Sequence, residues 1–175
     1  MNYSVDLYIE LCRATLKEQK TIQKKSTILN IHKLLNLRST SIIRIKDQQA
    51  YQNDPLGRKI IYYDDLERDI LISKKIIDLM KRTTELIDPS YSVHVMMTYM
   101  TTDSKGNRKS AKQEAEEFGY DRRVFKKEMD QEIEKALEKP EMEVLLNQIK
   151  RIAETGGRSE YVNVFKKMRE TQNDN

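Results

Sequence analysis

The residues with the clearest chemical potential in this chain are cations that cluster between positions 109 and 127. Two residues suited to helix capping lie among them, and the whole set comprises Lys109, Ser110, Lys112, Asp121, Arg122, Arg123, Lys126 and Lys127. Arginine can bind guanine through two hydrogen bonds, whereas lysine mostly contacts phosphates as a point charge. The chemistry that this set indicates is therefore the binding of nucleic acid.

The segment around these cations predicts a helix, a tight turn and a second helix. Ser110 is expected to cap the first helix, with Gln113 completing a capping box. Gly119 stands where the turn needs a residue that tolerates a positive φ, and Asp121 can then cap the second helix. The inner face of the second helix is expected to carry Phe125, Met129 and Ile133. Its outer face begins with two arginines and two lysines, which is typical of a helix-turn-helix DNA reader.

The turn sequence FGYDRR at 118–123 resembles the helix-turn-helix in the last DNA-binding domain of bacterial sigma factors and of sigma-like phage regulators. The stretch 88–100 is similar to the preceding buried helix of that domain, and the resemblance covers roughly residues 64–139. It departs from the family pattern at Glu114, where an aliphatic residue usually enters the core, and at Glu128, where an apolar or neutral residue is common. The resemblance implies a sequence-specific, sigma-factor-like transcriptional regulator of phage or mobile-element type.

The resemblance also implies a role for each candidate residue. The arginines and lysines of the second helix would enter the major groove of double-stranded DNA. Lys109, Ser110 and Lys112 would contact the DNA backbone, aided by the N-terminus of the first helix. Asp121 would either cap the second helix or pair with a neighbouring arginine and withdraw it from DNA.

Three alternatives fit the same residues. The two helices could be a plain structural pair. The chain could be a helical assembly protein, such as a small terminase-like DNA-packaging subunit that forms homo-oligomers through its N-terminal helix. It could also be a protein-interaction module, whose cationic helix recognises an acidic surface on a host factor such as RNA polymerase.

Positive charge is concentrated locally along the chain. The net charge is +4, from 32 basic and 28 acidic residues. Residues 1–60 hold eleven Lys/Arg and five Asp/Glu, an excess of +6 that exceeds the whole-chain value. The remainder is slightly acidic, so the second helix of the predicted motif is a basic patch on a balanced background. A local patch indicates docking in one orientation rather than a uniform cationic coat.

Other classes of function find little support in the sequence. His32 and His94 lie far apart and Cys12 is the single cysteine, which gives neither zinc-ligand spacing nor a disulfide framework. No glycine-rich phosphate loop or nucleophile elbow occurs, so we expect no cofactor and no enzymatic activity. The acidic run at 114–117 is interpreted as a solvated helix surface. No apolar run approaches ~20 residues and no signal peptide is evident, which indicates a cytoplasmic protein without a membrane partner.

The chain is expected to be mainly α, beginning with a helical N-terminal region at 1–63. One long or broken helix should run from about residue 4 to residue 37. The β-branched and aromatic runs at 41–46 and 59–63 predict a short β-hairpin, with an extended linker as the alternative.

Residues 64–139 should form the helix-turn-helix domain, followed by a C-terminal helix and tail at 140–175. A helix capped by Asp64 or Asp65 is expected to end before Pro89, which starts the next helix. Pro140 should begin the C-terminal helix, and the glycine pair at 156–157 should break it. The packing expected around the motif places four residues against the helix that holds Val93 to Met100: Ala115, Phe118, Phe125 and Met129.

Overall fold

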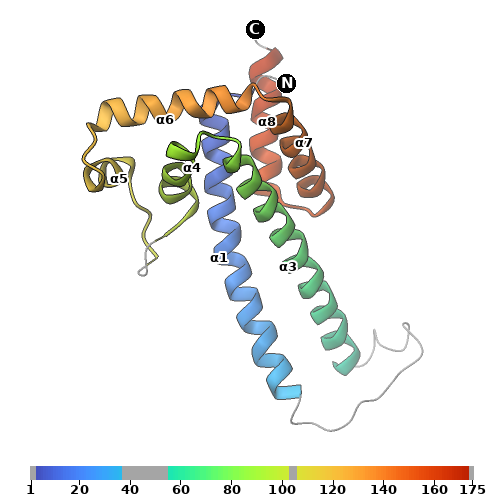
Figure 1. Ribbon diagram of the computed structural model, residues 1–175. Helices are drawn as coiled ribbons and strands as arrows, with labels where there is room; N and C mark the ends of the chain where they lie inside the picture. Colours follow the sequence, from blue (N-terminus) through green and yellow to red (C-terminus); the bar gives the residue numbers. More distant parts are fainter. Residues whose placement is uncertain (1–2, 37–54, 103–105, 174–175) are drawn as a thin grey trace. The chain divides into compact units, whose positions relative to one another are not determined.

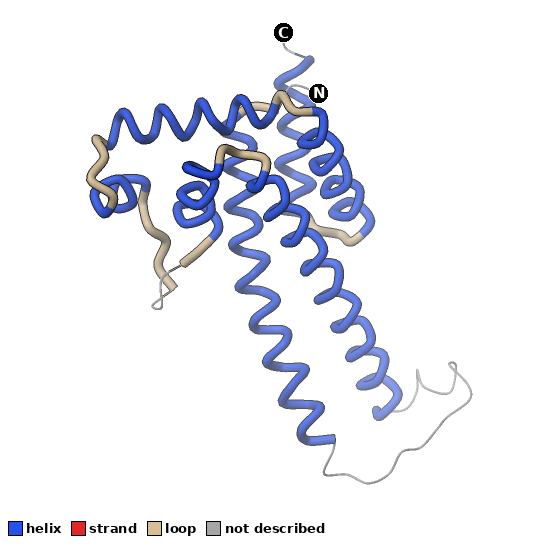
Figure 2. Tube along the Cα trace, in the orientation of Figure 1, coloured by secondary structure: helices blue, strands red, loops and turns tan. Residues whose placement is uncertain are grey.

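The computed structural model describes residues 3–36, 55–102 and 106–173, and every element in these ranges is helical (Figures 1 and 2). The elements are α1 (Val5–Asn36), α3 (Pro55–Glu85), α4 (Pro89–Val95), the π-helix η1 (Met96–Met100), α5 (Ala111–Glu117), α6 (Arg122–Leu137), α7 (Pro140–Thr155) and α8 (Ser159–Asn173). The prediction of a mainly α protein is confirmed. No helix among the described residues combines the length and apolar composition needed to cross a bilayer.

The chain divides into two compact units, and the helices α1 and α3 each contribute residues to both. The main unit consists of Met1–Glu18 and Lys75–Asn175, and the second, which we call the two-helix unit, is Gln19–Lys74. In the two-helix unit, Leu29 of α1 packs against Leu66 and Ile70 of α3. Partly buried Ile22 and Tyr63 extend this small cluster.

The predicted β-hairpin is wrong where it can be tested. Its first run, 41–46, lies outside the described residues, while its second run, 59–63, is helical within α3. The helix also begins at Pro55, so Asp64 and Asp65 lie inside it and do not cap it. The reason is that Tyr63 shares a helical stripe with Leu66 and Ile70 at i, i+3, i+7 spacing, and this stripe outweighs local strand propensity.

The core of the main unit joins the start of the chain to its end. The hydroxyls of Tyr8 and Thr83 lie 3.0 Å apart, which links α1 to α3. Tyr161 of α8 donates to the hydroxyl of Thr15 at 3.0 Å, and Thr15 in turn donates to the carbonyl of Leu11 at 2.8 Å. Because each of these four hydroxyls has a partner, they can be buried without the cost of an unsatisfied donor or acceptor.

The predicted helix boundaries from Pro89 onward are confirmed. Asp88 caps α4, with its side chain accepting from the backbone N–H of Ser90 at 2.8 Å, and Pro89 is the first helical residue. Pro140 begins α7 in the same position. Gly157, at φ +65°, ends α7 and allows α8 to turn back along it.

We expect the stability of the main unit to fall as the pH rises above about 9. Burial raises the pKa of the Cys12 thiol to about 12, and burial likewise raises the pKa of Tyr99 to about 12 and that of Tyr8 well above 10. The unfolded chain therefore releases these protons between about pH 9 and 12 while the folded chain keeps them, which favours unfolding. Urea unfolding followed by circular dichroism at pH 8, 10 and 11 tests this. Cys12→Ala should flatten the pH dependence, whereas a midpoint that does not move between pH 8 and 11 would contradict the expectation.

Candidate nucleic-acid interface

The start of α5 is fixed by the capping box that the sequence predicts. The hydroxyl of Ser110 accepts from the backbone N–H of Gln113 at 3.2 Å, and the backbone N–H of Ser110 donates to the Gln113 side chain at 2.9 Å. These two bonds satisfy N–H groups that a helix N-terminus otherwise leaves without partners. The side chain of Ser110 is therefore already used by the fold.

The turn between α5 and α6 has the hydrogen bonds of a Schellman motif. The N–H of Tyr120 donates to the carbonyl of Ala115 at 2.9 Å, and that of Gly119 donates to Glu116 at 3.3 Å. Gly119 adopts φ +73°, as expected. Asp121 then accepts from the backbone N–H of Arg123 at 2.9 Å and so caps α6, and no arginine side chain of the described ranges pairs with its carboxylate. The chain therefore leaves one helix and enters the next in a single defined geometry.

The inner face of α6 is buried as predicted. Phe125, Met129 and Ile133 are fully buried, and α6 packs against α4 and α5. Phe118 and Val93 are each 56% exposed, although Phe118 still contacts α4 as predicted, through the ring of His94 at 4.7 Å. Phe118 follows the last residue of α5 and so leaves its inner face, and the buried face of α4 is formed by His94 and Val95 rather than by Val93.

A buried polar pair connects α4 to α5. The Nδ1 atom of His94 lies 2.9 Å from Oε1 of Glu114, whose side chain is only 1% exposed. Lys109 approaches the other carboxylate oxygen of Glu114 at 3.7 Å and pairs with Glu117 at 2.5 Å. The interpretation of Glu114 as a solvated surface residue is therefore wrong. It faces the core because His94, twenty residues earlier, supplies a partner inside it.

Aromatic rings pack against His94 in this pair. The ring centroid of His94 lies 4.7 Å from that of Phe118 and 5.0 Å from that of Phe125, both edge-on. Tyr120 stacks on Phe125 at 5.3 Å. Edge-on and offset arrangements of this kind are favourable beyond the apolar area that they bury. The turn residues are thereby fixed to both α4 and α6.

The presence of a glutamate at position 128 is also explained by a partner on α4. The hydroxyl of Tyr91 donates to Oε2 of Glu128 at 2.7 Å. This hydrogen bond, followed by partial burial, raises the pKa of Tyr91 to about 12. The two glutamates that depart from the sigma-factor pattern thus bind side chains one helical turn apart on α4, Tyr91 and His94. Both exceptions to the apolar pattern have a structural reason.

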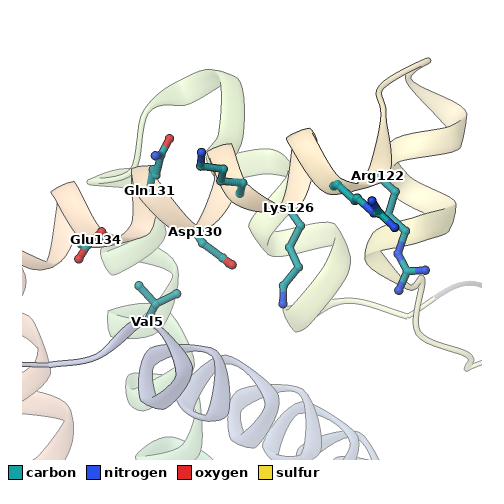
Figure 3. Close-up of a pocket in the computed structure, with 8 residues that line it drawn as sticks. Val5, Arg122, Lys126, Asp130, Gln131 and Glu134 are labelled. Atoms are coloured by element: carbon teal, nitrogen blue, oxygen red, sulfur yellow. The ribbon is translucent and has the colours of Figure 1, made fainter.

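The four cations of α6 are all exposed and border an open groove of about 700 Å³. The groove is lined by Val5, Arg122, Arg123, Lys126, Lys127, Asp130, Gln131 and Glu134. Figure 3 shows Lys126 and Asp130 pointing toward the first turn of α1, and Gln131 pointing away from it. Burial raises the pKa of Asp130, and Lys126 opposes this shift. The groove is therefore cationic at the start of α6 and acidic farther along it.

The structure divides the eight predicted residues into two groups. Arg122, Arg123, Lys126 and Lys127 lie together on one helix, and within the described part of the chain none of them forms an ion pair. The other four have structural contacts. Ser110 and Asp121 cap helices, Lys109 pairs with Glu117, and Lys112 lies 3.6 Å from Glu116.

Two further residues, which no pattern in the sequence singles out, lie on the exposed side of α6. Val124 is 52% exposed although it is apolar, and Gln131 is exposed beyond it. A helical projection at ~100° per residue separates both from the stripe of Phe125 and Met129. An apolar group can contact the methyl group of thymine and an amide can bind adenine, so both belong among the candidate base-reading residues.

Comparisons with known proteins found no relative of this chain. No protein-family model, no curated protein and no solved structure matches the chain. The resemblance to sigma factors therefore stays a prediction. In the described ranges, no group of three or more His, Cys, Asp or Glu side chains is arranged to hold a metal ion.

Gly119→Val should destabilise the main unit by about 1–2 kcal/mol, because valine is strained at positive φ. An added Cβ would meet no atom within 4 Å, so backbone strain alone is tested. Gly119→Asn is the matched control, since asparagine tolerates this conformation, and it should cost much less. Chemical denaturation measures both. Equal losses for the two variants would contradict the assigned backbone conformation.

Glu114→Ala should destabilise the main unit by about 2 kcal/mol, because it leaves the buried Nδ1 of His94 without its partner. Glu116→Ala is the control on the same helix. Its side chain is exposed and, among the described residues, pairs only with Lys112, so the change should stay within ~0.5 kcal/mol. The denaturation midpoints of the two variants measure both effects. A Glu114→Ala midpoint equal to that of the wild type would show that the pair does not hold α5 to α4.

Proposed function

We propose that this protein is a sequence-specific DNA-binding regulator, in which α5, the turn and α6 act as a helix-turn-helix. The observation that carries the proposal is the group of four cations at the start of α6, directly after a tight turn, none of which forms an ion pair within the described residues. In helix-turn-helix proteins, the N-terminal residues of the second helix contact base edges in the major groove. Arg122 and Arg123 are the first two residues of α6 and so occupy that position.

Rigid positioning of the cations supports this proposal. Capping by Asp121 fixes the direction of α6, and the buried face around Phe125 fixes its rotation about its axis. Side chains held on a rigid helix lose less conformational entropy on binding than side chains on a mobile loop. Arg122 and Arg123 would then pair with guanine, and Lys126 and Lys127 would contact phosphates on either side.

The residues at the start of α5 take a smaller part in this proposal. The side chain and the backbone N–H of Ser110 are both used by the capping box of α5. Lys109 and Lys112 must exchange their contacts with Glu117 and Glu116 for contacts with phosphate. Because that exchange offsets part of the gain, we expect them to contribute less to affinity than the cations of α6.

A second candidate function is a protein-interaction module, for example one that binds RNA polymerase. The observation in its favour is that the groove along α6 carries both signs of charge, with Asp130 and Glu134 beyond the cations. A polyanion gains nothing from the acidic end of this groove, whereas a protein segment of mixed charge can use all of it. Either function would place the protein in the cytoplasm, where DNA and RNA polymerase are found in bacteria.

Alanine substitution of the cations tests the proposal. The probe is a duplex recovered by selection from a random-sequence pool. Arg122→Ala or Arg123→Ala should cost roughly 1–3 kcal/mol on this duplex and relax discrimination at one base pair. Lys126→Ala or Lys127→Ala should instead weaken binding to every duplex and lower the salt slope by about one.

Arg151→Ala on α7 is the matched control, because it removes one exposed cation from a different helix. It should leave the affinity for the selected duplex within twofold of the wild type. If the selection enriches no sequence, or if all four α6 variants bind as the wild type does, the DNA-binding proposal fails. The protein-interaction function then takes its place.

A further inference from the structure

Two aromatic side chains lie exposed directly before α6. Phe118 follows the last residue of α5, and Tyr120, which is 49% exposed, follows Gly119 in the turn. Both rings contact His94, with centroid distances of 4.7 Å for Phe118 and 6.3 Å for Tyr120, so they belong to one surface. We call Phe118 and Tyr120 the ring pair. Exposed apolar side chains that gather in one place mark a candidate binding surface.

The ring of Tyr120 has one covered face and one open face. It stacks on the fully buried ring of Phe125, with 24° between the two planes. His94 lies nearer to Phe125, at 5.0 Å, than to Tyr120, at 6.3 Å, so it sits on the Phe125 side of the tyrosine ring. Within the described ranges, no other ring contacts Tyr120. The exposed area of this ring therefore belongs to its outward face and its edges.

Positive charge lies beside the ring pair. Arg122 follows Tyr120 by two residues, so their Cα atoms are at most about 7.6 Å apart. The acidic residues on both sides of the turn already have partners, because Glu116 and Glu117 pair with lysines near the start of α5 and Asp121 caps α6. The charge that a ligand of the ring pair meets first is therefore that of the α6 cations.

We propose that the ring pair stacks on unpaired bases of a nucleic acid whose phosphates contact the cations of α6. Aromatic faces beside cations are the two parts of a surface that binds single strands, because every base has a π-face and every linkage carries a phosphate. This inference rests on the proposed binding of DNA by α6, and it adds that part of the bound DNA is single-stranded.

Unpaired bases fit the ring pair better than paired bases do. In a duplex the base faces are stacked on one another, and only the base edges reach the grooves. The outward face of Tyr120 therefore gains stacking only from a base that has left the duplex stack. The side chain of Phe118 has no hydrogen-bonding group with which to read a base edge. A DNA that is opened next to the duplex bound by α6 would occupy both the cations and the ring pair.

Binding to two nucleic acids tests the inference. The probes are oligothymidylate, which is single-stranded, and a mixed-sequence duplex of the same length, each followed by fluorescence anisotropy. The double variant Phe118→Ala, Tyr120→Leu should weaken binding to oligothymidylate by at least about tenfold and leave binding to the duplex within about twofold. Leucine at position 120 keeps an apolar side chain against Phe125, and thermal unfolding followed by circular dichroism checks that the variant is folded.

Two further variants show whether the aromatic ring itself is responsible. Tyr120→Phe restores a ring at this position, so it should recover most of the affinity for oligothymidylate that Tyr120→Leu loses. Tyr62→Leu is the matched control, because Tyr62 is also an exposed tyrosine but belongs to α3 in the two-helix unit. This control should bind both probes as the wild type does. Equal losses in Tyr120→Phe and Tyr120→Leu would overturn the stacking role of Tyr120.

Photochemical cross-linking locates the contact. Oligothymidylate that carries iodouracil in place of thymine should cross-link to Phe118 or Tyr120, as identified by mass spectrometry of the proteolysed complex. Cross-links found only at other residues would overturn the inference.

The duplex probe separates failure of the inference from failure of the proposed function. If the wild type binds the duplex but does not bind oligothymidylate, or if the double variant binds oligothymidylate as tightly as the wild type does, the inference is overturned and DNA binding stands. If the wild type binds neither probe, both are overturned, and a protein segment becomes the candidate occupant of the ring pair.

Discussion

The hydrogen bond between His94 and Glu114 is the interaction on which the geometry of α5 and α6 depends. It places a carboxylate in a position that an apolar side chain would otherwise fill, and the rings of Phe118 and Phe125 lie edge-on against His94. A buried pair of this kind is costly to break and is satisfied in only one arrangement. It therefore sets where α5 lies on α4, and the turn then sets where α6 begins.

Local chemistry in the sequence was sufficient to predict most of the boundaries around this site. Ser110 with Gln113, Gly119, Asp121 and Pro140 each act on atoms a few residues away, so their effects can be worked out without knowing the fold. The burial of one face of α6 could be predicted for the same reason, because its apolar residues recur at the spacing of a helix. The prediction of function had no such support, because exposed cations have many physical uses.

The failures of prediction involve partners that are distant in the sequence. Glu114 reads as a surface residue until His94 is placed beside it, and Val5 could not be assigned to the groove along α6 from any local pattern. The run at 59–63 has strand propensity, but Tyr63 belongs to a helical stripe that packs on Leu29. In each case a tertiary contact outweighed a local preference.

The contact between Thr15 and Tyr161 has a consequence for how the chain reaches its folded state. The two residues are 146 positions apart, and Glu10 and Lys167 are 157 apart. During synthesis, Glu10 and Thr15 of α1 must therefore wait for α8 to leave the ribosome before these partners exist. The α4–α6 region has partners within 20 to 37 positions and can assemble earlier. We expect the closing of this longest loop to come last in the folding of the main unit.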